Sequence, residues 1–343
     1  MVTTTKSHIA ESLKLIDRGL GKPSSFPLSA NVRMIAGEEF LLQTTNHEAD
    51  VLVKVETDVV EKPFDVIIDG KTFVKAMRKL SGVISFRVQS GKLSIVCEGS
   101  EFRLAITPGV FPDFDEPKED VWRIVIDSES LHLALKQTMF ATKDDENRPV
   151  VRGVYFGDNI VATDSSRLCI STIAVKGDFV LPAEPLSLCF QLSGEVEITA
   201  SDNRVIFTDG ERSISIAKLS IDYPNWRHLV PTDSPVRVIV NRTDLLAMAD
   251  KASLVYDDYR AVALIVGEGK LTIAVRGDVN EYEESIEADT SGECTVHLSA
   301  QFIAEFLKVA DTHHIEMGLN GDLKPCILKA GDYRCVMMPV RVS

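Results

Sequence analysis

The stretch VISFRVQSGKLSIVCEGSEFRLAI, residues 83–106, recurs twice in altered form along this chain. The second copy is EVEITASDNRVIFTDGERSISIAKL, residues 195–219, and the third is HIEMGLNGDLKPCILKAGDYRCVMMPV, residues 314–340. In all three copies apolar and polar residues alternate, and Gly or Asn interrupts the alternation. This pattern predicts a pair of half-buried antiparallel strands in each copy.

The spacing of these stretches indicates that they belong to a larger repeated unit. Gly99, Gly210 and Gly331 mark the second turn of each copy, at intervals of 111 and 121 residues. After the first two copies comes a matching exit, FPDFDEP from Phe111 and YPNWRHLVP from Tyr223. The repeat therefore spans the whole chain, and the exits lead into linkers.

Within the repeats, short apolar strands run into a residue that can begin a helix. The segments are DVIID ending at Asp69, RIVID at Asp127, RVIVN at Asn241, TVHLS at Ser299 and, more weakly, DFVLP at Pro182. Side-chain oxygens of Asp, Asn and Ser accept hydrogen bonds from free N–H groups at helix starts. Apolar residues at helical spacing follow each segment. Ile9, Leu13, Ile16 and Leu20 predict one more helix, without a clear strand before it.

The sequence thus predicts an α+β fold of three tandem copies, with boundaries at residues 1–120, 121–232 and 233–343. We expect each copy to contain two helices and about eight short strands in antiparallel sheets. The C-terminal CVMMPVRVS is the third copy of EFRLAITPG and SISIAKLSI, the last strand of a unit. Met338, Pro339, Val340 and Val342 then lie at or beyond a strand end with no further copy to cover them, which favours a docking surface or plain core about equally.

Composition restricts the function classes. The 343 residues are 45% hydrophobic and 26% charged, as in ordinary globular proteins, and no apolar run is long enough to predict a membrane span. The first residues lack the apolar core of a signal peptide, and the six cysteines are scattered, so we expect a cytoplasmic protein with reduced thiols. A net charge of −14 disfavours wholesale wrapping by nucleic acid, although one face can differ from the total.

Candidate chemical motifs are weak. GLGKPSS, residues 19–25, lacks the first glycine of a phosphate loop and places Pro23 where a backbone donor is needed. His313 and His314 point apart on a strand, and KDDENRP from Lys143 is typical of a solvated loop. We therefore predict no catalytic residue, no metal and no cofactor.

Two stretches contain residues that are unusual for a plain turn or linker. RPVVRGVYFGDNIVATDSSRL, residues 148–168, predicts two strands joined at GDN, then a polar turn in which Asp164 accepts from backbone N–H groups. The linker YPNWRHLVP places Trp226 and His228 where plainer residues are usual.

Four segments resemble the bacterial sliding clamp family, the beta subunit of DNA polymerase III. ENRPVVRGVYF is similar to the strand after the second domain's first helix, and VATDSSRL to the family's ATDGHRL turn. YPNWRHLVP resembles its FPDYRRVLP linker, and CVMMPVRV its YVVMPMRL ending. All four occur in order on a threefold repeat of the right size.

The resemblance implies a DNA sliding clamp, a processivity factor that is not an enzyme. It implies a head-to-tail homodimeric ring that encircles double-stranded DNA without reading its sequence, with helices lining the hole. The implied DNA-binding residues are Lys22, Lys71, Lys75, Arg78 and Arg148. The second helix expected in the middle copy carries no base, so DNA contact there is in doubt. The implied dimer-interface residues are Phe102, Leu104 and Leu254.

The family also has a pocket for short peptides from polymerases, the clamp loader and repair proteins. The matching residues here are Val151, Thr163, Ser165, Ser166, Arg167, Leu168, Pro224, His228, Leu229, Leu323, Val336, Met337, Met338, Pro339, Val340 and Arg341. Ser165, Ser166 and His228 depart from the family's residues, so peptide preference can differ. Two alternatives stay open: a replication accessory protein on the same repeat that does not form a ring, and a metal-dependent nuclease using Asp144 and Asp145.

Overall fold

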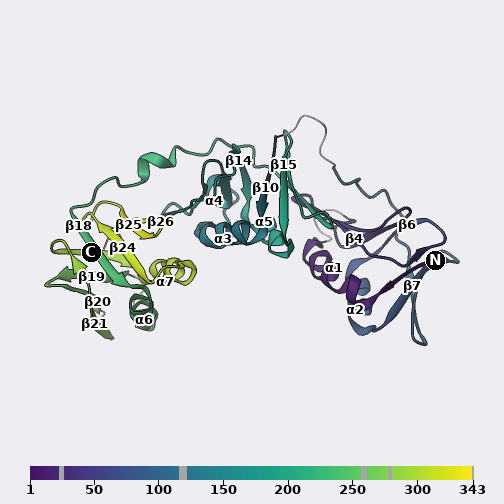
Figure 1. The fold of residues 1–343 in the computed structure, drawn as a ribbon, viewed down its shortest axis with the longest axis horizontal. Helices are drawn as coiled ribbons and strands as arrows, with labels where there is room; N and C mark the ends of the chain where they lie inside the picture. Colours follow the sequence, from purple (N-terminus) through teal and green to yellow (C-terminus); the bar gives the residue numbers. More distant parts are fainter. Residues whose placement is uncertain (23–26, 116–121, 256–260, 277–279, 342–343) are drawn as a thin grey trace. The chain divides into compact units, whose positions relative to one another are not determined.

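The computed structural model describes residues 1–22, 27–115, 122–255, 261–276 and 280–341 (Figure 1). It contains two compact units, residues 1–132 with 184–218, and residues 133–183 with 219–343. The boundary between the units runs within residues 121–232, so the division into three copies at 120 and 232 remains a prediction. Within the described ranges, no helix is long and apolar enough to cross a membrane.

The predicted helix starts are confirmed at four capping residues. The carboxylates or amide oxygens of Asp69, Asp127 and Asn241 and the hydroxyl of Ser299 accept hydrogen bonds from N–H groups in the first helical turn. The helices that follow are α2 (Gly70–Lys79), α3 (Ser128–Thr138), α6 (Arg242–Ala252) and α7 (Ala300–Val309). After the weaker signal at Pro182 come only α5 (Ala183–Leu186) and the 3-10 helix η2 (Ser187–Gln191).

The N-terminal helix α1 (Lys6–Gly19) also follows a strand, which the sequence analysis did not expect. Strand β1 (Val2–Thr5) consists of one valine and three threonines, and the Thr5 hydroxyl caps α1 by accepting from the His8 N–H. Threonine is β-branched and favours strands, but its hydroxyl hides the apolar alternation by which strands are found.

The first unit holds two antiparallel sheets. The five-stranded sheet has the order β5 (Val59–Val60), β1, β7 (Val83–Gln89), β8 (Lys92–Cys97) and β9 (Ser100–Ala105). The eight-stranded sheet has the order β10 (Trp122–Asp127), β15 (Glu195–Ala200), β16 (Arg204–Thr208), β17 (Arg212–Ala217), β4 (Ala49–Val55), β3 (Phe40–Thr45), β2 (Asn31–Ala36) and β6 (Phe64–Asp69). Helices α1 and α2 pack together and against these strands, burying side chains such as Phe40, Phe73 and Phe86.

The second unit also holds two antiparallel sheets. The nine-stranded sheet has the order β14 (Phe179–Pro182), β11 (Gly153–Phe156), β12 (Ile160–Thr163), β13 (Arg167–Ser171), β26 (Tyr333–Met337), β25 (Cys326–Ala330), β24 (His314–Leu319), β18 (Val236–Asn241) and β22 (Asp289–Thr290). The four-stranded sheet has the order β21 (Glu281–Glu287), β20 (Lys270–Arg276), β19 (Ala261–Gly267) and β23 (Cys294–Ser299). Helices α6 and α7 lie side by side (Figure 1).

Two local expectations need correction. Each predicted strand pair is a run of three strands, β7–β9, β15–β17 and β24–β26, because the turn inside each stretch separates one more strand. Gly99, Gly210 and Gly331 do lie in turns with φ of 84°, 92° and 60°, a conformation that favours glycine. In the predicted strand after Arg148, residues Pro149–Arg152 instead form a helical turn, α4, with proline at its first position.

The strand order shows how successive copies join. Strand β17, the last of the second copy, pairs with β4 of the first, and β26 of the third copy pairs with β13 of the second. By chain order, β9 corresponds to β17 and β26, and β21 corresponds to β4 and β13. Both β9 and β21 lie at sheet edges among the described strands.

Candidate functional site

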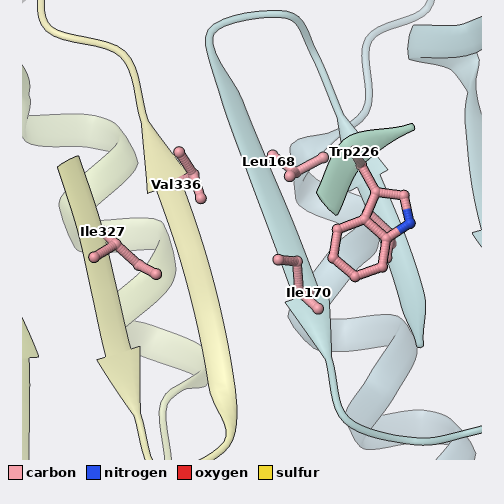
Figure 2. Close-up of a cluster of buried hydrophobic side chains, with 6 residues drawn as sticks. Leu168, Ile170, Trp226, Ile327 and Val336 are labelled. Carbon is pink, nitrogen blue, oxygen red and sulfur yellow. The ribbon is translucent and has the colours of Figure 1, made fainter. Parts of the chain in front are cut away.

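The pairing of β13 with β26 builds an apolar layer on one face of the nine-stranded sheet. Leu168 lies opposite Val336 in this ladder, and Ile170 follows on the same face because side chains alternate along a strand. Trp226 of the 3-10 helix η3 (Trp226–Leu229) lies beside Leu168 and Ile170, and Ile327 lies beside Val336 on the next strand (Figure 2). All six members of this cluster, including Val161, are buried.

Exposed apolar side chains surround this buried layer. Leu229, Leu323 and Met338 are 54%, 76% and 45% exposed, which is unusual for large apolar residues. The segment of Met338 is tied to its neighbours: the Met338 N–H donates to the Ser166 carbonyl at 2.9 Å, and the Val340 N–H donates to the His297 carbonyl at 2.8 Å. Asp322, beside Leu323, lies 3.4 Å from the His297 ring nitrogen. We call Leu229, Leu323 and Met338, with the Leu168–Val336 layer, the docking surface.

A rigid turn borders the docking surface. As predicted, the Asp164 carboxylate accepts hydrogen bonds from the N–H groups of Ser166 and Arg167, both at 2.9 Å. The Thr163 hydroxyl donates to the Arg167 carbonyl at 2.6 Å and closes the turn. Ser165 adopts φ of 79°, a conformation that favours glycine, so the turn holds a strained residue.

Arg167 itself lies on the opposite face of β13 from Leu168. Its guanidinium donates to the carboxylates of Asp164 and Glu305 and, at 2.6 Å, to the Phe140 carbonyl. The guanidinium carbon of Arg167, Cζ, lies 4.9 Å from the ring centre of Phe140 and 4.0 Å from that of Phe302. Burial alone would lower the pKa of Arg167, but the hydrogen bond and charge of Glu305, with Asp164, raise it. The residue joins the turn to α7, and its direct contact with a peptide stays a prediction.

We expect Arg167→Met to destabilise the second unit strongly. Removing a charge that is only 6% exposed leaves the Asp164 and Glu305 carboxylates without their partner, at a cost of about 3–5 kcal/mol. Urea unfolding followed by circular dichroism measures the loss. Arg237→Met is the matched control, because the Arg237–Glu316 pair is solvent-exposed and worth about 1 kcal/mol or less. If Arg167→Met lowers the free energy of unfolding no more than the control does, Arg167 does not hold the turn to α7.

The other predicted docking residues divide by exposure. Val151 is buried in α4, and Met337 is buried on the helix-covered face of β26 with Arg167. Thr163, Pro339 and Val340 are half-buried, while the exposed set comprises Ser165, Ser166, Pro224, His228 and Arg341. Arg148 donates to Asp145 at 2.8 Å and to the Ser165 hydroxyl at 3.4 Å, so it stands beside the docking turn.

The basic residues predicted on α2 share one exposed face. Lys71, Lys75 and Arg78 are exposed, while Phe73 and Met77 are buried on the other side. Arg78 pairs with Asp17 at 2.7 Å, whereas Lys71 and Lys75 form no ion pair within the described residues. Lys22 is also exposed. This face suits loose contact with phosphates, as does the absence of acidic residues from α2.

The acidic loop is engaged in ion pairs. Asp145 lies 2.8 Å from Arg148, which lowers the pKa of Asp145 mainly through their hydrogen bond, and Asp144 lies 3.3 Å from Arg152. In the described parts of the chain, no group of three or more His, Cys, Asp or Glu residues is arranged to hold a metal ion.

The junction of β4 and β17 corresponds to the junction of β13 and β26 but has polar side chains. Asp50 pairs with Ser215 there, at the ladder position that Leu168 and Val336 occupy between β13 and β26. Arg204 reaches Asp50 at 2.6 Å and the Ser215 hydroxyl at 2.7 Å. Burial raises the pKa of Asp50, although Thr45 and Arg204 oppose the shift. An ion pair thus fills the place where the β13–β26 junction has buried apolar side chains.

The predicted dimer residues lie on edge strand β9 and near edge strand β21. Phe102 and Leu104 are half-buried on β9, and Leu254, just after α6, is 82% exposed. Near Leu254, Lys251 bonds Glu284 of β21 at 2.7 Å. Leu254 is therefore an apolar side chain without cover beside an acidic edge strand.

Sequence reasoning missed several residues of this site. Ile170 and Ile327 belong to the buried apolar layer with Trp226, and Tyr155 and Tyr223 pack against this layer. The rings of Tyr155 and Tyr223 stack with their centres 5.1 Å apart. Burial raises the pKa of Tyr223 above that of a free tyrosine. The alternation along β13 could have found Ile170, since it lies two residues from Leu168.

Comparisons with known proteins identify the fold of the chain. Residues 227–341 match the family described as DNA polymerase III beta subunit, C-terminal domain. The beta sliding clamp of Bacillus subtilis is 22% identical, over 99% of this chain and 99% of its own. The crystal structure of the Bacillus subtilis sliding clamp has a TM-score of 0.92 at 21% identity, covering 100% of this chain and 99% of that one. The chain is similar to bacterial sliding clamps along its whole length and has their fold. The DNA polymerase III beta subunit of Pseudomonas aeruginosa, at a TM-score of 0.92 and 20% identity with both chains fully covered, has the same sliding-clamp fold.

Proposed function

We propose that this protein is a DNA sliding clamp, a processivity factor that encircles duplex DNA and tethers a polymerase to it. The observation that carries the proposal is the full-length match to the sliding-clamp fold. Tethering raises the effective concentration of a polymerase at the primer end, so its dissociation seldom ends synthesis. The mechanism is topological and needs no catalytic group, and the six free thiols fit the reducing cytoplasm.

Closure of a ring by two protomers follows from the way strands of successive repeats pair within one chain. The last strand of a copy extends the sheet of the preceding copy twice within one chain, as β17 on β4 and β26 on β13. The third pairing of this kind would be β9 on β21, and both strands are free edges among the described residues. A head-to-tail contact between β9 of one protomer and β21 of another repeats this pairing, and two such contacts close a ring.

The charges on β9 and β21 support this proposed contact between protomers, which we call the seam. Strand β21 presents exposed Glu281, Glu283 and Glu287, whereas Arg103 is exposed on β9 and Arg87 on β7, two strands in from β9. Within the protomer these arginines share Glu101, whose pKa falls to about 2 through hydrogen bonds from Ser94 and Arg103. An acidic edge facing a basic one steers the correct pairing and disfavours β21 pairing with itself.

The DNA contacts are proposed on the basic helix face. Lys71, Lys75 and Arg78, with Lys22, would meet backbone phosphates without reading bases. Long exposed side chains suit contacts that form and break as the ring slides. Arg148 instead donates to Asp145 and Ser165 at the docking turn, which competes with a contact to DNA phosphates.

The docking surface would receive short peptides from polymerases, the clamp loader and repair proteins. A buried aromatic and aliphatic floor with exposed Leu229, Leu323 and Met338 around it suits leucine and phenylalanine side chains. Methionine adapts its shape to different partners. The ion pair at the β4–β17 junction explains why one protomer would offer this surface once.

A linearisation experiment tests the proposal. The protein is loaded onto nicked circular DNA by a clamp loader, isolated by gel filtration, and the DNA is then cut once. We expect the circle-bound protein to be lost within minutes of cutting, because a closed ring slides off free ends. Protein that stays on the linear DNA identifies an ordinary binder, and DNA cleavage with Mg²⁺ that Asp144→Asn removes would identify the nuclease alternative.

A further inference from the structure

Two buried thiols face each other behind the docking surface. Cys169 of β13 and Cys335 of β26 are directly opposite in the ladder, and their sulfur atoms lie 2.8 Å apart. Neither side chain is exposed to solvent. They occupy the face of the sheet opposite Leu168 and Val336, so each cysteine is the chain neighbour of a docking-layer residue.

A small cavity approaches the thiol pair from one end of the strands. It has a volume of about 170 Å³ and is lined by residues that include Gln137, Ser171 and Tyr333. Ser171 and Tyr333 lie two positions from Cys169 and Cys335 on the same face of the two strands. The buried Tyr333 side chain lines the cavity, and burial together with the neighbouring Cys169 and Cys335 raises the pKa of its hydroxyl. A molecule of a few atoms can therefore come within one side chain of the thiols.

We propose that Cys169 and Cys335 are an oxidative modification site, at which hydrogen peroxide converts the thiol pair into a disulfide across the β13–β26 ladder. The sulfur of one cysteine attacks a peroxide oxygen, the O–O bond breaks, and water and a sulfenic acid form. The second thiol then displaces the hydroxyl group, which leaves as water with the thiol proton. Two thiols lose two electrons in total, and one peroxide is reduced to two waters.

The surroundings make this reaction slow and selective. Burial, with the neighbouring Cys169, raises the pKa of the Cys335 thiol, so little reactive thiolate exists at neutral pH. Reduced thiols are thus the resting state, and sustained oxidant is needed to form the bond. Since β13 and β26 belong to different predicted copies, the disulfide would join the two walls of the docking surface covalently and leave Leu168 and Val336 in place.

The test uses the full-length protein, treated with hydrogen peroxide for hours, quenched with catalase, then denatured and alkylated without reductant. We expect four alkylated cysteines instead of six, and peptide mapping should link Cys169 to Cys335. Cys189, fully buried and with a raised pKa from burial, should remain a free thiol. Closing so long a loop should raise the melting temperature by roughly 5 °C or more.

Matched variants decide the result. Cys169→Ser and Cys335→Ser should each lose the cross-link, and Cys189→Ser should keep it. The proposal is overturned if all six cysteines stay alkylatable, if the disulfide joins another pair, or if the cross-link forms only after urea is added. Because the readout is the cysteine pairing, this outcome is independent of whether the protein encircles DNA.

Discussion

The double variant Leu254→Asp, Arg103→Glu should run as a single chain of 37.8 kDa, whereas the native protein should run at twice that mass. Leu254 is 82% exposed and Arg103 is exposed on an edge strand, so neither change should disturb the protomer. At the proposed seam, however, the first change buries a carboxylate and the second turns an attraction to the glutamates of β21 into a repulsion. Such like-charge contacts cost several kcal/mol, which weakens dimerisation by about 100-fold or more.

Sedimentation at low micromolar concentration measures this change, and retention on circular DNA should disappear with the dimer. The control is Val110→Asp with Arg237→Glu, which introduces the same two acidic residues at exposed positions outside β9, β21 and α6. The seam is placed wrongly if the Leu254 and Arg103 variant still sediments as a dimer. If the native protein is itself monomeric, the non-ring accessory protein becomes the better interpretation.

Much of the fold could be read from the sequence because the repeat supplied three independent copies of each signal. Capping residues at Asp69, Asp127, Asn241 and Ser299 were found correctly, since a side-chain oxygen at a helix start acts locally. Strand β1 was missed because threonine hides apolar alternation, and α4 because proline at a first helical position resembles a strand boundary.

The site was predictable only in part, for reasons of strand geometry. Resemblance placed Arg167 and Leu168 in one pocket, but consecutive residues of a strand face opposite sides of the sheet. Arg167 accordingly binds Glu305 of α7, more than a hundred residues away, which no local pattern could indicate. The contrast between Leu168–Val336 and Asp50–Ser215 likewise emerges only when both ladders are aligned by their pairing.

That contrast gives the sheet junctions distinct roles. The Asp50–Arg204 pair fills the β4–β17 junction with charges largely withdrawn from solvent, and such a pair is weak evidence for added stability. At the β13–β26 junction the same ladder position is apolar, and the adjoining Leu323 and Met338 keep apolar surface in contact with water. Such surface is costly to leave exposed, so its presence argues for an occupant.

Met338→Asp should abolish capture of a labelled six-residue peptide that carries leucine and phenylalanine. The side chain is 45% exposed, so the protein should fold normally, but a bound peptide would bury the new carboxylate against apolar groups. An unpaired buried charge costs at least about 3 kcal/mol, which corresponds to a loss of roughly 100-fold or more in affinity. Leu323→Asp, at 76% exposure on a separate loop, should act in the same direction.

Fluorescence anisotropy of the peptide provides the measurement, with Val110→Asp as the control because Val110 is 90% exposed and outside the docking surface. Circular dichroism should show unchanged folding for all three variants. The linearisation experiment separates docking from ring function: Met338→Asp rings loaded at high loader concentration should still be lost from cut DNA. Peptide affinity within threefold of native for both Met338→Asp and Leu323→Asp would move the docking site elsewhere, because two apolar side chains from different segments would then contribute nothing to binding.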